Sequence, residues 1–170
     1  MNIFFITPFP DSIKTLVENN IANQGAKKGL VNINIINLRD FAKDSYKKID
    51  DEPYGGGSGM VMMCQPFFDA IDFCISQSDS KPKVIFPSPK GKVLNHSIAS
   101  ELSKEESLIF ICGHYKGLDE RIIEKYVDLE VSIGDYVISN GELSSMIVFD
   151  SIVRLIPGVL NDLNSAMTDS

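Results

Sequence analysis

Residues 107–117 read SLIFICGHYKG, an apolar run that ends in a loop bounded by two glycines. A short run of this kind, rich in isoleucine and phenylalanine, is typical of a strand that is buried on both faces. Glycine at the end of such a strand lets a ligand approach the backbone closely. The segment therefore predicts a central strand whose carboxyl end opens into a loop that can bind a ligand.

Similar runs lie on either side of this segment and alternate with helical patterns. Strands are predicted at residues 2–6, 31–38, 83–86 and 127–133. Helices are predicted around residues 13–21, 66–74, 95–104, 120–126 and 143–156. Strands that alternate with helices indicate an α/β domain with a mostly parallel sheet. Sheets of this class bind ligands at the carboxyl ends of their strands.

Three loops follow predicted strands and are rich in glycine, proline or small polar residues: 87–91, 113–117 and 134–141. Their shared position after strand ends suggests one pocket built largely from backbone groups. The alternative is that these glycines only form turns, and spacing alone does not separate the two interpretations.

Composition narrows the class of protein. Apolar residues make up 44% of the 170 residues, and no stretch approaches the length of a membrane span. Three cysteines without metal-ligand spacing favour a reducing compartment, so a cytoplasmic location is expected. The net charge of −7 argues against nucleic-acid binding. However, basic residues gather at 39–48 and 81–92, either as solvated loops or as phosphate contacts.

Other candidate motifs are weak when they are taken alone. Residues 39–59 are predicted to form a long loop because they contain charges, a proline and four glycines. The run 50–60, DDEPYGGGSGM, covers its end and matches neither a Walker loop nor a dinucleotide fingerprint. No nucleophile triad or metal motif is evident. Asp150 and Arg154 are four residues apart on the last predicted helix, a spacing that is typical of an exposed salt bridge. Asp169 lies in a polar tail.

Five segments taken together resemble one family. They are DDEPYGGGSGMVM (50–62), PSPKGK (87–92), ICGHYKGLDERI (111–122), SIGDYVISNGELSSM (132–146) and RLIPGVL (154–160). The chain is similar to the tRNA (guanine-N1)-methyltransferases, the TrmD family of the SPOUT class. The resemblance implies helices on both faces of the sheet and a deep trefoil knot in its C-terminal part. Elementary folding rules do not predict such a knot.

The resemblance also implies domains and partners. Residues 1–160 would form the catalytic domain that binds S-adenosylmethionine, and 161–170 would begin a linker or active-site loop. A helical C-terminal domain that grips tRNA would be absent from these 170 residues. The family forms homodimers with each active site at the subunit interface, and no membrane is involved.

The implied reaction is methyl transfer to N1 of the guanosine immediately 3′ of the tRNA anticodon. Asp169 would be the general base, and Arg154 would stabilise negative charge at guanine O6. The implied cofactor-binding residues are Pro89, Gly113, Tyr115, Ile133, Gly134, Asp135, Tyr136, Val137, Ile138 and Gly141. No protein metal ligands are implied, and a Mg²⁺ requirement is not readable from the sequence.

The chain departs from the family pattern at three informative positions. His114 stands where the family usually has Arg, and Lys116 stands where it usually has Glu. A cation at residue 116 would repel a sulfonium unless it pairs with the cofactor carboxylate or with RNA phosphate. Asn140 replaces a frequent Gly, and asparagine tolerates a positive φ. The alternative function is therefore a non-catalytic module that binds cofactor or RNA.

Overall fold

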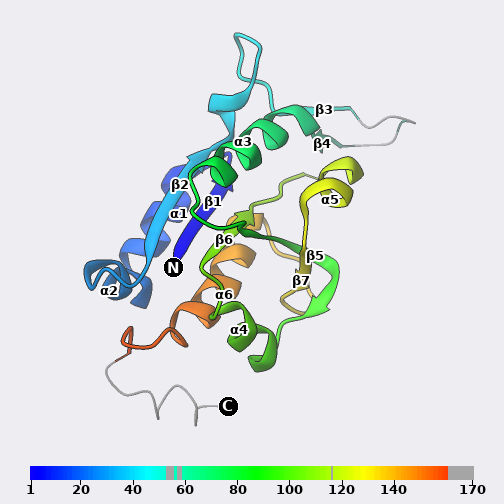
Figure 1. Cartoon of the computed structure of the whole chain (residues 1–170). Helices are drawn as coiled ribbons and strands as arrows, with labels where there is room; N and C mark the ends of the chain where they lie inside the picture. The colour runs from blue at the N-terminus through cyan, green and yellow to red at the C-terminus, as the bar shows by residue number, and fades with distance from the viewer. Residues whose placement is uncertain (53–55, 57–58, 116, 161–170) are drawn as a thin grey trace.

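A parallel sheet forms the centre of the molecule (Figure 1). The computed structural model describes residues 1–160 except 53–55, 57–58 and 116. Within these residues the sheet has five strands in the order β2-β1-β6-β5-β7, and every neighbouring pair is parallel. The strands are β1 (Asn2–Thr7), β2 (Asn32–Asn37), β5 (Lys83–Val93), β6 (Ser107–Ile111) and β7 (Leu129–Ser132). Each residue of β6 is buried, which confirms the central strand predicted from 107–112.

Helices cover both faces of the sheet, as predicted. One core contains side chains of α1 (Pro10–Glu18), α2 (Ile21–Lys27), α4 (His96–Leu102) and α6 (Gly141–Val153). The other contains side chains of the 3₁₀ helix η1 (Leu38–Phe41), α3 (Cys64–Ser76) and α5 (Glu120–Tyr126). In the first core the ring of Phe5 stacks on Phe110 at 5.1 Å and meets the edge of Phe149 at 5.2 Å. The sheet is thus the middle layer of three.

Two predicted boundaries on the N-terminal side were wrong. The helix expected from residue 13 to 21 breaks at Asn20, whose side chain accepts a hydrogen bond from the amide of Ala22 and caps α2. The loop expected at 39–59 contains ordered structure: most of η1 at its start, and the strand β3 (Asp50–Asp51), which pairs antiparallel with β4 (Val61–Met62) just beyond it. Both differences arise from local capping and pairing, which apolar periodicity does not report.

The predicted end of strand 83–86 was also wrong, because β5 continues to Val93. Its register against β7 shifts between Pro87 and Lys92, so the prolines lie at an irregularity where a missing amide is tolerated. Gly91 packs so closely on β7 that an added Cβ would lie 2.4 Å from the Val131 nitrogen. The segment expected as a free loop therefore belongs to the sheet.

The last helix is shorter than predicted. α6 ends at Val153, and a turn rather than a helix carries the chain to Pro157. The described cysteines are unpaired; Cys74 and Cys112 are buried and Cys64 is partly buried. Among the described helices, none is both long enough and apolar enough to cross a membrane.

Candidate active site

A cavity of about 330 Å³ lies at the carboxyl ends of β6 and β7, beside the register shift in the middle of β5. The three segments predicted to share a pocket meet there. The lining includes Pro87, Ser88 and Pro89 from β5, Gly113, His114, Tyr115 and Gly117 after β6, and residues 133, 134 and 136–141 after β7. The position agrees with the rule that parallel sheets bind ligands at this edge.

The residues implied as cofactor contacts line this cavity, with the exception of Asp135. Asp135 is exposed to solvent beside the lining segment. The structure thus brings Pro89, Gly113 and Gly141 together from three separate elements. Their contact with a cofactor remains a prediction.

Two glycines make the closest backbone approach in the cavity wall. The amide of Gly141 donates a hydrogen bond to the carbonyl of Gly113 at 2.9 Å. A Cβ added at Gly141 would lie 2.4 Å from the Gly113 nitrogen, a distance that real structures do not show. These glycines are therefore required for packing, and they are more than turn formers.

Aromatic side chains stand at the cavity. Tyr115 has a positive φ of 60°, which is uncommon outside glycine and indicates a constrained loop. Burial and the neighbouring Asp50 carboxylate raise the pKa of the Tyr115 hydroxyl, so this side chain stays neutral at pH 7. Tyr136 donates a hydrogen bond to the carbonyl of Ile133 and remains more than half exposed. Both rings offer apolar faces beside polar backbone groups.

Asn140 does not use the positive φ that the sequence suggested. Its φ is −159°, an extended conformation that any residue adopts. The side chain caps α6 by accepting a hydrogen bond from the amide of Leu143 at 3.0 Å. Replacement of glycine by asparagine therefore supplies an N-cap at the start of the helix that borders the cavity.

A buried carboxylate beneath the cavity was missed by the sequence reasoning. Glu142 is 1% exposed, and its two oxygens contact Thr7 Oγ1 at 2.5 Å and His114 Nε2 at 2.6 Å. Burial opposes ionisation, but the hydrogen bonds from His114 and Thr7 outweigh it and hold the pKa of Glu142 below its usual value. An acidic residue in the first turn of a helix normally indicates a solvated group at the dipole, so no local signal revealed this cluster.

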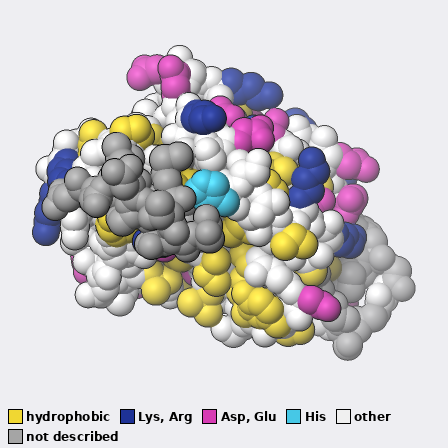
Figure 2. Space-filling view, turned by 90° about the horizontal axis from the view of Figure 1, so that it is seen from below, with side chains coloured by type: hydrophobic (Ala, Val, Ile, Leu, Met, Phe, Trp, Pro, Cys, Tyr) yellow, Lys and Arg dark blue, Asp and Glu magenta, His cyan; other side chains and the backbone are white. Residues whose placement is uncertain are grey.

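A second, larger hollow of about 600 Å³ lies between α1, α4 and α6, and Arg154 lines it. Asp150 lines the same groove, but the two side chains do not form the salt bridge expected from their spacing. Leu143 and Ile147 of α6 line it as well, and each is at least 40% exposed. Figure 2 shows hydrophobic side chains gathered on the face seen from below, the side on which Figure 1 places α4.

Arg154 is remote from the cavity of its own chain. Thirteen residues separate it from Gly141 along α6, and at 1.5 Å per residue this places their backbones about 20 Å apart. Sequence spacing could not show that the two predicted site regions open into different hollows. Asp169 and Lys116 lie outside the described residues.

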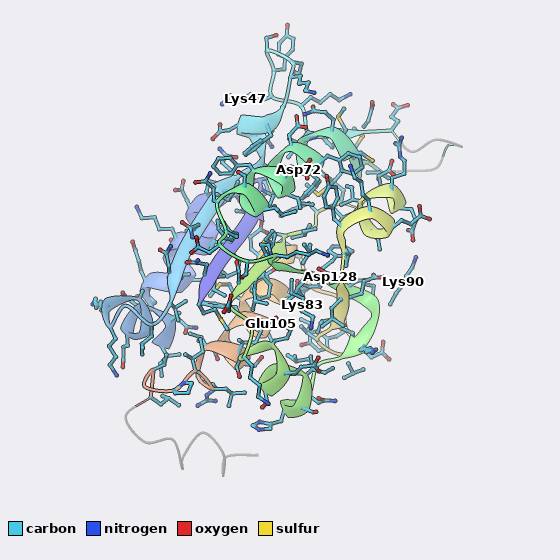
Figure 3. The ribbon with its side chains drawn as sticks, in the orientation of Figure 1. Lys47, Asp72, Lys83, Lys90, Glu105 and Asp128 are labelled. Atoms are coloured by element: carbon cyan, nitrogen blue, oxygen red, sulfur yellow. The ribbon has the colours of Figure 1, made fainter. Side chains whose placement is uncertain are left out.

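Most lysines of the basic groups 39–48 and 81–92 are paired with carboxylates. Lys43, Lys47 and Lys48 each lie within 4 Å of an aspartate. Figure 3 shows Lys47 at the tip of the molecule and Lys83 near Glu105, with which it forms an ion pair of 3.0 Å. Lys90 lies apart from them, next to the cavity residue Pro89. Within the described part of the chain, no three His, Cys, Asp or Glu side chains gather as metal ligands.

Comparison with known proteins gives one consistent result. The family model described as tRNA (Guanine-1)-methyltransferase TrmD matches residues 1–170. The tRNA (guanine-N(1)-)-methyltransferase of Ruminiclostridium cellulolyticum is 50% identical across the whole chain, which covers 73% of that relative. The enzyme of the same name from Anoxybacillus flavithermus is 47% identical, with 69% of its length covered. The crystal structure of tRNA (m1G37) methyltransferase from Aquifex aeolicus superposes with a TM-score of 0.87 at 40% identity, covering 95% of this chain and 72% of that one.

Proposed function

Because this chain belongs to the tRNA (guanine-1)-methyltransferase family, we propose that the cavity at the strand ends binds S-adenosylmethionine and serves methyl transfer to tRNA. The enzyme class follows from the family and from relatives that match over the full chain. The target would be N1 of the guanosine immediately 3′ of the anticodon. The observation that carries the cofactor site is the convergence on one cavity of the irregular middle of β5 and the segments that follow β6 and β7.

The cavity residues fit this cofactor. A volume of about 330 Å³ is within the range of small-molecule sites. Gly113 and Gly141 pack tightly and have no side chains, so one wall of the cavity consists of peptide groups. Such groups can hydrogen-bond an adenine edge. Ile133 and Ile138 supply apolar surface for the faces of the ring. When bound, S-adenosylmethionine supplies an electrophilic methyl group on its sulfonium.

The remaining chemistry belongs to side chains of this protein. Guanine N1 carries a proton at neutral pH, so its attack on a methyl group requires a general base. We propose that the carboxylate of Asp169 is this base and accepts the N1 proton. Arg154 would donate hydrogen bonds to guanine O6, where negative charge develops as the proton leaves.

The position of Arg154 supports a site shared between two copies of the chain. A helix length of about 20 Å separates its backbone from Gly141, so the same subunit cannot readily bring both to one guanine. A second copy seated on the groove between α1 and α6 would supply Arg154 to the cavity of its partner. The exposed apolar side chains of Leu143 and Ile147 in that groove favour such an interface.

The C-terminal knot of the SPOUT class is part of the same proposal. After β7 at one edge of the sheet, the chain returns past β5 and places Gly141 against Gly113 at the end of β6. This return path supports a threaded arrangement around the cavity.

The proposal is tested first by calorimetric titration with S-adenosylmethionine and S-adenosylhomocysteine. Micromolar binding near one site per subunit is expected for a cofactor pocket of this kind. Transfer is then measured with a tritiated methyl donor and a tRNA transcript. A second transcript, in which adenosine replaces the target guanosine, is the control. A folded protein that binds neither compound would reject the assignment of the cavity.

A further inference from the structure

We propose that Glu142 is a positioning residue for the cofactor cavity. Its buried carboxylate holds the His114 side chain and thereby fixes the backbone of residues 113–115, which lines the cavity. The inference rests on the proposed cofactor role of that cavity and adds the element that holds one of its walls in place.

The contacts of Glu142 account for both of its oxygens. Thr7 Oγ1 donates to one oxygen and His114 Nε2 contacts the other, at 2.5 and 2.6 Å. A carboxylate that is 1% exposed is unfavourable unless such partners compensate for the lost water. Hydrogen bonds to an ionised acceptor are shorter and stronger than neutral ones. Glu142 therefore connects the end of β1, the loop after β6 and the first turn of α6.

His114 is held from three directions. Its ring lies against the ring of Phe9 at a centroid distance of 4.9 Å, and its backbone amide contacts Met62 Sδ at 3.1 Å. The bond to Glu142 is the third contact. The next residue, Tyr115, has a positive φ, a strained conformation that persists only where neighbouring contacts enforce it. The clamp on His114 provides such enforcement next to the strained residue.

The two amide replacements of His114 separate this role from general packing. The amide nitrogen of glutamine corresponds in reach to Nε2 of histidine, whereas that of asparagine corresponds to Nδ1. Both variants lose the ring contact with Phe9 and lose any positive charge. Only His114→Gln keeps a donor within reach of the Glu142 carboxylate. In His114→Asn one oxygen of this buried carboxylate loses its partner, which is unfavourable.

The experiment measures S-adenosylhomocysteine affinity by calorimetry for the parent chain and for His114→Gln, His114→Asn, Glu142→Gln and the double variant His114→Asn/Glu142→Gln. Glu124→Gln, an exposed carboxylate-to-amide change on α5, is the control. His114→Asn and Glu142→Gln should each weaken binding about tenfold. His114→Gln should remain close to the parent, and the double variant should be little worse than either single variant because both changes break the same contact.

Melting temperatures measured without ligand serve as the second readout. His114→Asn should melt below His114→Gln, because it leaves one oxygen of the buried Glu142 carboxylate without a donor. Calorimetry is therefore run well below both melting transitions, where each variant is folded, so that a difference in affinity reports positioning rather than unfolding. Equal loss of affinity in these two variants, or strictly additive effects in the double variant, would overturn the proposal. If Glu142→Gln does not fold, the comparison of the two His114 variants decides alone. Failure of the parent chain to bind would instead reject the cofactor site.

Discussion

The amide of Gly141 lies 2.9 Å from the carbonyl oxygen of Gly113, so the first residue of α6 rests directly on the loop after β6. This contact closes one wall of the strand-end cavity, and it leaves no space for a side chain at residue 141. The cavity wall is therefore sensitive to the smallest possible substitution.

Gly141→Ala should weaken S-adenosylhomocysteine binding by at least about tenfold, because the added methyl group must displace the Gly113 backbone. Gly29→Ala is the matched control. Gly29 has a φ of 70° but no heavy atom near its added Cβ, so it tests backbone strain without a clash at the cavity. Calorimetry should show near-normal binding for the control. Equal binding by Gly141→Ala would show that this wall is not part of the site.

Arg154→Ala should lower the rate of methyl transfer by about 10²–10³ while leaving cofactor affinity nearly unchanged. The variant should be rescued when it is mixed and refolded with Gly141→Ala. Each mixed dimer then has one intact cavity that faces an intact Arg154. At an S-adenosylmethionine concentration too low to fill the Gly141→Ala cavity, random mixing predicts about a quarter of the parental activity. Absence of rescue in confirmed mixed dimers would argue that both groups act within one subunit.

Asp169→Asn should abolish transfer and leave cofactor binding nearly unchanged, because the amide cannot accept the N1 proton. Single-turnover methylation and calorimetry are measured on the same preparation of each protein. If both activities are lost in parallel, Asp169 is not acting as the base.

Lys116→Glu should tighten cofactor binding, since the change removes a cation that would repel the sulfonium. The comparison of S-adenosylmethionine with S-adenosylhomocysteine, which has no sulfonium charge, isolates this effect. Weaker binding of both compounds would show instead that Lys116 is a ligand contact.

Stability toward acid should depend on Glu142. Its pKa is lowered in the folded state, so its contribution is present at neutral pH and is lost as the pH falls below the usual range of glutamate, roughly pH 4. Urea unfolding from pH 7 to pH 3 should show a shallower loss of stability on the acid side for Glu142→Gln than for the parent chain. Identical pH profiles would mean that folding does not lower the pKa of Glu142.

Local pattern was sufficient for the layers of the fold. The apolar run ending at Cys112 predicted a buried strand because a central parallel strand must be apolar on both faces. It was insufficient for β5, which continues through Pro87 and Pro89 because β7 and a register shift accommodate these prolines. Strand propensity describes one segment, whereas this extension depends on a neighbour more than 30 residues away.

The sequence alone determined the α/β class, the parallel sheet and the three segments that share the cavity, since period, glycine position and strand burial are properties of short stretches. The tertiary structure alone decided that Glu142 joins Thr7 across 135 residues and His114 across 28, and that Arg154 opens into a groove away from Gly141. These relationships depend on how distant elements pack, and burial of a carboxylate has no signature in its own segment. The fold class followed from local chemistry, and the arrangement of the site followed from contacts between distant parts of the chain.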